Sequence, residues 1–302
     1  MNQNLIFDIK RYAINDGPGI RVAVFFKGCN LRCAWCHNPE SHEFGPELMY
    51  SLRRCILCGS CVDVCAHHSL KLSPNGILID HESCTGCGDC AESCPTSALE
   101  ISGKVMSNEE ILAIIEKELI FLENSGGGVT FSGGEPLLHA PRLKELLIAC
   151  GAKGIHRAVD TAGHVPSAVL MDIARYTDLF LFDLKMMDSD QHRQWTGVGN
   201  ELILSNLKEL SASGAEIIIR IPLIGGVNDT KENITASAQF IATLPEPLKK
   251  VQILVYHPVA QHKFEKMGKA EAFVRLKEPS ADSILNALAI FKEYEIEAET
   301  GG

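Results

Sequence analysis

The cysteines are the residues of this sequence whose type and spacing best suit chemistry. Eleven of the twelve lie between Cys29 and Cys94, in groups with two or three residues between neighbours. Thiolates are strong ligands for iron and zinc, and close spacing lets several of them hold one metal centre. Disulfides are rare in reducing compartments, and the first residues contain no apolar stretch typical of a secretory signal peptide. We therefore predict that these cysteines bind metal.

The first group contains three cysteines. Cys29, Cys33 and Cys36 are spaced CxxxCxxC directly after an apolar segment. Three thiolates can bind three irons of a 4Fe–4S cluster and leave the fourth iron open, as a catalytic metal requires, whereas structural clusters use four cysteines. A zinc site, or a cluster with a remote fourth ligand, is the alternative, although zinc sites favour paired CxxC elements. The spacing favours a reactive iron–sulfur centre.

The other eight clustered cysteines form an internal repeat. Cys55–Leu72 aligns with Cys84–Ile101 at an offset of 29 residues, and such self-similarity is typical of a duplicated unit. Each copy has the CxxCxxCxxxC spacing of two-cluster bacterial ferredoxins, in which the fourth cysteine binds the cluster of the other copy. Ala66 stands where a proline is usual, whereas the second copy has Pro95. We predict one 4Fe–4S site with Cys55, Cys58, Cys61 and Cys94, and a second with Cys84, Cys87, Cys90 and Cys65.

An alternation of strands and helices must position these groups. Apolar strand candidates lie at Val22–Phe26, Val129–Ser132, His156–Asp160, Leu179–Leu184, Glu216–Pro222 and Val251–Tyr256. Helical patterns lie at Arg142–Ala152, which includes Cys150 as a core residue, and at Ser167–Tyr176, Leu202–Ser213, Lys231–Thr243 and Ser283–Glu293. A further helix begins after Ser107, which forms a capping box with Glu110.

Buried strands that alternate with helices predict an α/β fold with a parallel sheet. A closed eightfold barrel typically needs ~250 residues, more than remain once the cysteine repeat is set aside. A partial barrel or an open doubly wound sheet therefore fits better. In both architectures, functional residues gather at the carboxyl ends of the strands.

Composition narrows the class of protein further. A chain of 302 residues with 46% apolar content can bury a sizeable core. A formal net charge of −10 argues against a nucleic-acid partner, and no apolar run is long enough for a membrane span. We expect a soluble cytoplasmic protein. We also expect two domains, an α/β domain of residues 1–44 and 105–302, and a smaller domain of residues 45–104 that holds the repeat.

Three motifs together resemble a known family. DGPGIR at Asp16–Arg21, the cysteine triplet, and CHNPE at Cys36–Glu40 are similar to those of the glycyl-radical-enzyme activating enzymes, a branch of the radical S-adenosylmethionine (SAM) superfamily. The resemblance implies a partial (β/α)6 barrel with an inserted bacterial ferredoxin-like α+β domain. It implies that the open iron binds SAM, whose reductive cleavage gives a 5′-deoxyadenosyl radical. That radical removes hydrogen from a glycine of a partner glycyl radical enzyme. We expect an anaerobic monomer with three 4Fe–4S clusters.

The resemblance also implies which residues bind SAM. The family's GGE motif matches Gly133, Gly134 and Glu135, where glycines let the backbone approach a ligand and a carboxylate can accept from an ammonium group. The other expected SAM-site residues are Trp35, His37, Asp160, Asp183, Leu184, Lys185, Arg220 and His257. Asp160, Thr161 and Asp183 are expected to bind a monovalent cation as well. The alternatives are structural roles for His257 and the carboxylates, and a surface position for Trp35.

The insert and the core each allow other functions. The ferredoxin-like insert would relay electrons from a flavodoxin or ferredoxin, with a structural role or partner docking as alternatives. A pure electron carrier would leave the triplet and the GGE motif unexplained. A radical SAM enzyme acting on a small molecule would share the core, but DGPGIR and HNPE favour the glycyl-radical branch.

Overall fold

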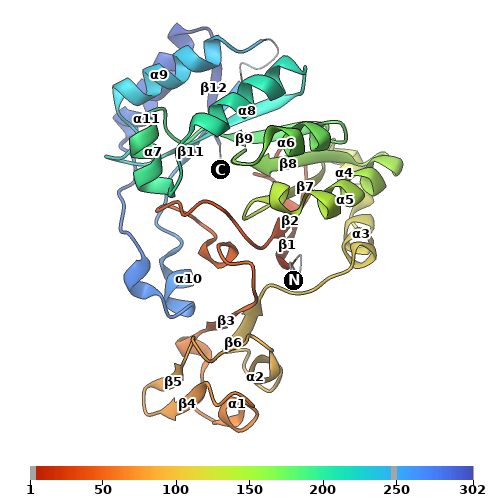
Figure 1. Cartoon of the computed structure of the whole chain (residues 1–302), viewed down its shortest axis with the longest axis vertical. Coiled ribbons are helices and arrows are strands. Elements are labelled where there is room, and N and C mark those ends of the chain that lie inside the picture. Colours follow the sequence, from red (N-terminus) through yellow and green to blue (C-terminus); the bar gives the residue numbers. More distant parts are fainter. Residues whose placement is uncertain (1–4, 246–249, 302) are drawn as a thin grey trace.

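The computed structural model describes residues 5–245 and 250–301, and its largest element is an eight-stranded sheet (Figure 1). In sheet order the strands are β1 (Ile6–Ala13), β2 (Arg21–Phe26), β7 (Gly128–Gly133), β8 (His156–Thr161), β9 (Leu179–Asp183), β10 (Ile217–Leu223), β11 (Lys250–Val255) and β12 (Glu297–Gly301). All pairs are parallel except β1 with β2. The six predicted strands are confirmed, with ends that differ by one or two residues.

Two edge strands were not predicted. Strand β12 has the sequence EAETG, which lacks the β-branched and aromatic residues that favour strands. Its conformation follows from parallel pairing with β11, from Lys250–Glu297 to Leu254–Gly301. Strand β1 follows the chain start and pairs antiparallel with β2. Tertiary pairing therefore sets both edges, and local sequence does not.

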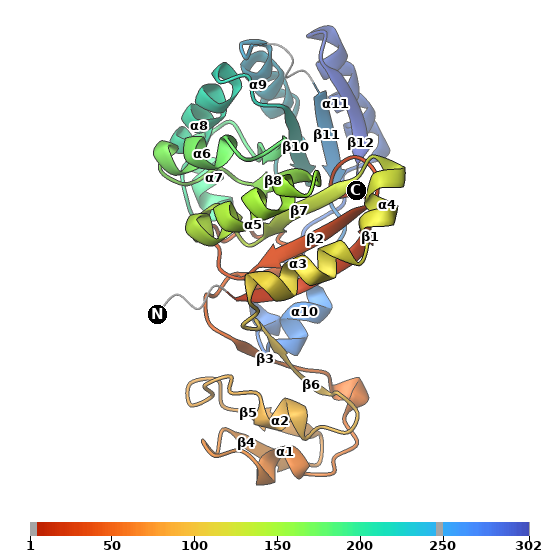
Figure 2. The ribbon, with the colours of Figure 1, turned by 90° about the vertical axis from the view of Figure 1, so that its right-hand side faces the viewer.

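The helices lie on the outer face of the sheet. They are α3 (Asn108–Glu116), α4 (Leu119–Ser125), α5 (Ala140–Ala152), α6 (Ser167–Ala174), α7 (Ser189–Thr196), α8 (Glu201–Ala212), α9 (Lys231–Ala242) and α11 (Ala281–Glu293), whereas α10 (Gln261–Lys266) lies below the sheet, against β3 (Glu47–Tyr50). The parallel strands follow one another in chain order, so right-handed crossovers bring successive helices to the same face. Figures 1 and 2 show them arranged around the outside of the sheet. The doubly wound alternative is therefore wrong, and the sheet is a partial barrel.

The main core lies between the sheet and these helices. It contains fully buried side chains from the central strands, such as Phe131 and Phe180, and from the helices, such as Leu146 and Leu207. Cys150 is buried in this core, as predicted. The Ser107–Glu110 capping box is also confirmed at the start of α3. No helix of the described residues is long and apolar enough to cross a membrane.

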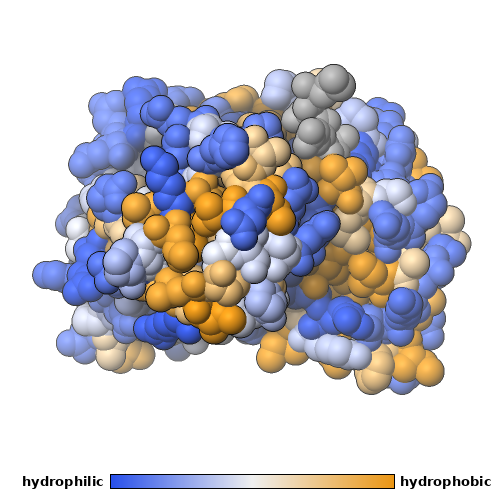
Figure 3. Space-filling model, turned by 90° about the horizontal axis from the view of Figure 1, so that it is seen from below, coloured by the Kyte–Doolittle hydropathy of each residue, from blue (hydrophilic) through white to orange (hydrophobic). Residues whose placement is uncertain are grey.

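The residues from β3 to β6 form a separate lobe, visible at the bottom of Figures 1 and 2. Its elements are β3 (Glu47–Tyr50), α1 (Ser60–Asp63), β4 (Leu70–Ser73), β5 (Gly76–Ile79), α2 (Asp89–Glu92) and β6 (Leu99–Ser102), and β3 and β6 connect it to the barrel. Short 3₁₀ helices lie at Pro39–Ser41, Leu52–Arg54, Pro136–His139 and Ala270–Ala272. Seen from below, this end of the molecule has patches of hydrophobic surface (Figure 3).

Buried histidines make the stability of this fold depend on pH. Burial lowers the pKa of His139 and His192, and it lowers the pKa of His42 from 6.5 to about 4. The folded state therefore holds His42 neutral, while the unfolded chain protonates it near its ordinary pKa. Between about pH 6.5 and pH 4 the unfolded state binds more protons. The contribution of His42 to the free energy of unfolding must fall as the pH drops through this window, whereas Glu135 and Asp160, whose pKa values burial raises, contribute in the opposite direction.

We expect the His42→Asn variant to differ from the parent protein in how its unfolding midpoint changes between pH 7 and pH 5, in urea titrations of the iron-free protein followed by tryptophan fluorescence. The variant lacks a group that destabilises the fold at pH 5, so its midpoint should fall less, or rise more, than that of the parent. An equal change in the variant and the parent protein would contradict the role of His42.

Candidate functional site

A cavity of about 420 Å³ opens at the carboxyl ends of the barrel strands. This volume is in the range of sites that enclose a cofactor-sized molecule. Its residues come from the loop after β2, from the ends of β7, β8 and β9, from β10, and from the end of β11. The cavity therefore lies where a parallel α/β architecture collects functional groups.

All three cysteines of the triplet line this cavity. Burial raises the pKa of Cys29 and Cys36 to about 12, and it also raises the pKa of Cys33. Buried thiols such as these lose their protons when a metal ion binds, because the positive charge of the metal stabilises the thiolates. The amide of Leu31 lies 3.4 Å from the Cys29 sulfur and donates toward it. Three converging thiols with a backbone donor fit an iron–sulfur cluster that has three protein ligands.

The carboxylates of Asp160 and Asp183 and the cations of Lys185 and Arg220 share the cavity with the cysteines, and Asp16 also lines it. Lys185 Nζ lies 2.6 Å from Asp183 Oδ2. Burial alone would lower the pKa of Lys185, but the charges of Asp183 and Cys33 outweigh it and raise that pKa overall. Arg220 Nη1 lies 3.3 Å from Asp160 Oδ2. Each buried charge thus has an opposite charge beside it, as the cost of burial requires.

Arg220 is the residue best placed to receive a ligand's carboxylate. It is buried, its Nη2 donates to the carbonyl oxygen of Asn15, and its Nε has no hydrogen-bond partner among the described residues. Burial raises the pKa of Asp160 to about 6, although Arg220 and a 2.8 Å hydrogen bond from Ser132 Oγ oppose this shift. A guanidinium beside two carboxylates on the cavity wall suits a ligand that carries both an amine and a carboxylate, as the methionyl part of SAM does.

The glycines of the GGE motif have a packing role at the end of β7. A Cβ at Gly134 would lie 2.1 Å from the carbonyl oxygen of Gly28, and a Cβ at Gly133, whose φ is +117°, would lie 2.3 Å from that of Phe26. Both glycines line the cavity, but they are required because the end of β7 packs against the start of the cysteine loop. Side chains there would push the triplet out of place.

Glu135 does not line the cavity. Its buried carboxylate accepts hydrogen bonds from Thr161 Oγ1 at 2.7 Å, from the amide of Ala162 at 3.0 Å and from the amide of Leu137 at 3.1 Å. Burial raises its pKa to about 7. Thr161 and Ala162 are themselves cavity residues. Glu135 thus joins the ends of β7 and β8 and, in this structure, makes no direct contact with the cavity.

Three of the four remaining predicted residues line the cavity, and one does not. Trp35, His37 and His257 line the cavity, and Trp35 is only 6% exposed, which excludes a surface position. His37 lies beside Tyr256, with ring centroids 5.9 Å apart. Leu184 is the exception, because its side chain is buried in the main core and does not reach the cavity. Tyr256, Asn15 and Ser132 line the cavity but were not predicted; Ser132 could have been found, because it belongs to the TFSGGEPL segment.

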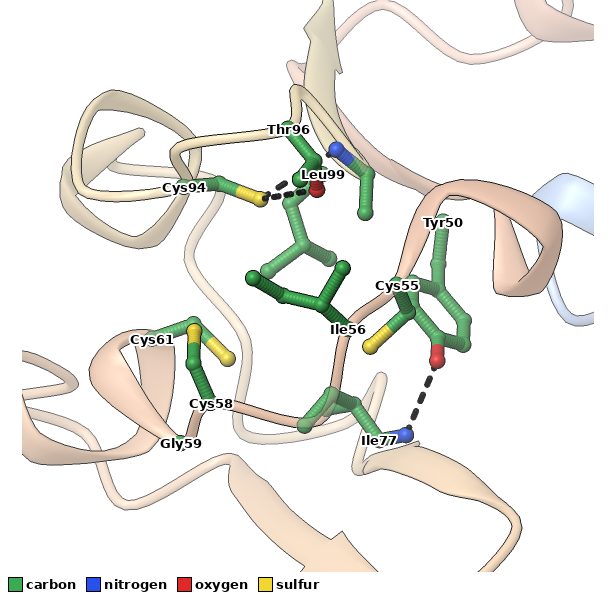
Figure 4. Close-up of a pocket in the computed structure, with 11 residues that line it drawn as sticks. Tyr50, Cys55, Ile56, Cys58, Gly59, Cys61, Ile77, Cys94, Thr96 and Leu99 are labelled. Carbon is green, nitrogen blue, oxygen red and sulfur yellow. Dashed lines mark hydrogen bonds between the residues drawn. The ribbon is translucent and has the colours of Figure 1, made fainter.

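The eight cysteines of the lobe gather in two groups. One pocket is lined by Cys55, Cys58, Cys61 and Cys94, and the other by Cys65, Cys84, Cys87 and Cys90. Figure 4 shows the sulfurs of the first group facing a common space beside Ile56 and Tyr50. The amides of Ser69 and Ala98 donate to the fourth cysteines, Cys65 at 3.3 Å and Cys94 at 3.2 Å. The grouping exchanges the fourth cysteine between the copies, which is the arrangement of two-cluster ferredoxins.

A buried ion network joins the lobe to the cysteine loop, and the sequence did not indicate it. Lys27 is fully buried, and its Nζ donates to Glu40 O at 2.5 Å and to Glu47 Oε2 at 2.7 Å. Lys269 binds the other oxygen of Glu47 at 2.8 Å, and Lys263 binds Glu40 Oε1 at 2.6 Å. Glu47 is the first residue of β3, where the chain enters the lobe. The position of the lobe is therefore tied to the loop that carries the triplet.

Comparisons with known proteins agree with this site. A profile of the radical SAM superfamily matches residues 65–238, and a profile of a 4Fe–4S single cluster domain matches residues 15–57. The trans-4-hydroxy-L-proline dehydratase activating enzyme of Clostridioides difficile is 40% identical, with 99% of each chain aligned. The choline trimethylamine-lyase activating enzyme of Oleidesulfovibrio alaskensis is 41% identical, with 87% of each chain aligned.

The solved structures that are similar to this chain include an activating enzyme and a protein of the same fold. A domain of pyruvate-formate lyase-activating enzyme from Bacteroides vulgatus is 39% identical, with a TM-score of 0.51 over 58% of this chain and 99% of that chain. SuiB of Streptococcus suis, bound to the precursor peptide SuiA, shares the fold with a TM-score of 0.54 at 14% identity, over 91% of this chain and 46% of that chain. Neither a pure electron carrier nor a small-molecule enzyme accounts for these relatives. The chain belongs to the activating enzymes of glycyl radical enzymes, within the radical SAM superfamily.

Proposed function

We propose that the chain installs a glycyl radical on a partner enzyme from the cavity at the carboxyl ends of the strands. The observation that carries this proposal is the convergence of Cys29, Cys33 and Cys36 on a cavity that also contains Arg220, Asp160 and Asp183. When bound there, a 4Fe–4S cluster supplies the electron that splits SAM, and the 5′-deoxyadenosyl radical so formed takes hydrogen from a glycine of the partner. The protein's contribution is to bind, orient and exclude water.

Each polar residue of the cavity has a role that follows from its contacts. The three cysteines hold the metal, and Lys185 offsets the negative charge of the thiolates beside it. Arg220 binds the SAM carboxylate, while Asp160 fixes the guanidinium. Asp160, Thr161 and Asp183 would also hold the monovalent cation that the family resemblance implies. Lys185 and Arg220 already balance the two carboxylates, so the folded chain does not need that cation for charge balance.

The other end of the cavity suits a nucleoside. Trp35 presents an apolar, buried indole, and Tyr256 packs in the same small cluster. His37 and His257 line the adjacent wall. Aromatic and imidazole rings provide stacking and hydrogen-bonding surfaces for an adenine base. The proposed orientation therefore has the methionyl group toward Arg220 and the adenosine toward Trp35.

The lobe is proposed to hold two further 4Fe–4S clusters, which makes three in all. Residues 45–104 would form a ferredoxin-like domain, and residues 1–44 and 105–302 the radical SAM domain. The supporting observation is the grouping of four cysteines on each of two pockets. We propose that this domain passes electrons from a flavodoxin or ferredoxin to the cavity. The enzyme would act as a monomer in the reducing cytoplasm, where the twelve unpaired cysteines stay reduced.

The partner's own substrate has no role in this cavity. The relatives named above activate a dehydratase of trans-4-hydroxy-L-proline and a lyase of choline, as their names state. The proposed reaction touches only a glycine of the partner protein. We therefore propose that selectivity between glycyl radical enzymes is a matter of protein–protein fit outside the cavity.

The role of Arg220 can be tested by binding. Arg220→Met should weaken SAM binding by about tenfold or more, because a charge-assisted hydrogen bond in a buried site is lost. The measurement is isothermal titration of anaerobic, iron-loaded protein with SAM, with iron and sulfide content unchanged. Arg175→Met, on the exposed end of α6, is the matched control. Equal SAM affinity in Arg220→Met and the parent would refute this role.

The relay proposal concerns the lobe cysteines. Cys58→Ala and Cys87→Ala should each slow flavodoxin-driven, single-turnover SAM cleavage by about tenfold or more. Mutating a residue that only supports a metal ligand already costs about tenfold, and these two variants remove a ligand itself. Dithionite-driven cleavage should change less, because a small reductant reaches the cavity directly. Cys150→Ala, in the core of α5, controls for the loss of a thiol. Undiminished flavodoxin-driven cleavage in folded variants with an intact triplet centre rules out the relay.

A further inference from the structure

The two copies of the repeat serve as structural controls for each other. An offset of 29 residues superimposes α1 on α2, the left-handed Gly59 on Gly88, and the left-handed His68 on Ser97. The environment of Gly59 and Gly88 is also equivalent, since their Cβ positions would meet Leu72 and Ile101 at 3.7 and 3.6 Å. A surface residue that differs between the copies is therefore not required by the scaffold.

The surfaces of the two copies differ in character. The first copy exposes the apolar residues Leu52, Ile56, Leu57 and Leu72, which are 58, 62, 41 and 49% exposed, and the basic residues Arg53 and Lys71. The positions that match these six are His81, Thr85, Gly86, Ile101, Glu82 and Glu100. The first copy is thus apolar and basic where the second is mostly polar and acidic. We call the six residues of the first copy the outer face.

Leu57 is the most informative residue of the outer face. Its φ is +59°, a left-handed conformation that is strained for a bulky side chain. The matching Gly86 also has positive φ, and there a side chain is excluded because a Cβ would lie 2.8 Å from Pro46 O. Leu57 has no such neighbour and projects into solvent. The chain keeps an exposed leucine at a position where its own backbone favours glycine.

The two copies also differ in what they contact. In the second copy His81 lies against Gly268 of the barrel, whereas Leu52 at the matching position of the first copy is 58% exposed. The outer face belongs to the copy that carries Cys55, Cys58 and Cys61, and Cys58 is exposed. The lobe that holds both copies lies at the lower end of the molecule in Figures 1 and 2.

We propose that the outer face is the docking surface for an acidic electron-carrier protein, which delivers its electron on the Cys58 side of the lobe. Contiguous exposed apolar residues beside basic ones are typical of an interaction surface. The chain as a whole is acidic, with a net charge of −10, so that an acidic partner is repelled elsewhere and steered to this basic region. In a symmetric dimer of this chain the basic residues of two outer faces would meet and repel, so a second copy fits less well.

This inference rests on the proposed function, because it names the partner of the relay. One electron leaves the carrier, which is oxidised, and one SAM is reductively cleaved. The partner glycyl radical enzyme is the alternative occupant. That enzyme must bring its glycine to the barrel cavity, whereas the outer face lies on the lobe.

The test uses reconstituted, anaerobic holoprotein and a recombinant flavodoxin as the probe, with affinity measured by biolayer interferometry at low and high salt. Leu57→Gly, which installs the residue of the matching position, should weaken flavodoxin binding by about tenfold because one buried apolar side chain is lost. Its urea midpoint should stay equal or rise, because the backbone strain is removed. Arg53→Glu should weaken binding and flatten the salt dependence. Glu82→Gln, at the matching position of the second copy, should leave binding unchanged.

The outcomes separate the alternatives. Weaker flavodoxin binding by Leu57→Gly and Arg53→Glu, with dithionite-driven SAM cleavage unchanged, supports the proposal. Undiminished flavodoxin binding in both variants overturns it. It is also overturned if these variants keep flavodoxin binding but lose dithionite-driven activation of the glycyl radical enzyme, because the outer face would then serve that enzyme. Flavodoxin binding is measured without SAM, so a protein that docks flavodoxin here but cleaves no SAM refutes only the proposed function.

Discussion

The cost of burying charge governs the cavity on which everything else depends. Three thiols, two carboxylates, an ammonium and a guanidinium are enclosed at the ends of the barrel strands. An isolated ion in such a place is unfavourable by several kcal/mol, so each must meet an opposite charge. Lys185 with Asp183 and Arg220 with Asp160 satisfy this requirement within the chain. The thiols do so only with a cationic metal, which explains why burial raises their pKa values in the metal-free chain.

The same constraint explains the residues around the cavity. Glu135 is fully buried, yet it is satisfied by a hydroxyl and two amides, so it can hold two strand ends together without a cation. Lys27 is fully buried beside a carbonyl oxygen and Glu47, and it ties the lobe to the loop that carries the triplet. The electron relay that we propose from the lobe to the cavity would benefit from a fixed distance between the two. Packing around Gly133 and Gly134 fixes the other side of the same loop.

Much of this arrangement could be predicted because cysteine spacing is a local property. The ferredoxin spacing alone predicted which fourth cysteine groups with which copy, and apolar runs located six strands to within one or two residues. The alternation also predicted that Asp160, Asp183 and Arg220 would meet, because the carboxyl ends of parallel strands share one edge.

What could not be predicted depends on contacts between distant residues. Strand β12 is polar and exists through pairing with β11, and Leu184 faces the core because the strand alternates sides. The motif suggested that Glu135 would face the ligand, but its carboxylate turns to Thr161 and Ala162. Lys27 and Glu47 are 20 residues apart in the sequence, and Glu47 and Lys269 are 222 residues apart. No pattern in the sequence indicates that these side chains are in contact.

The central claim is that the triplet leaves one iron open for SAM. The most direct measurement is electron–nuclear double resonance on the reduced, anaerobic holoprotein, with SAM that carries ¹⁵N in its amino group. The account predicts a changed electron paramagnetic resonance spectrum on SAM addition and a hyperfine coupling to the labelled nitrogen. A spectrum that SAM leaves unaltered, with no coupling to ¹⁵N, would contradict it.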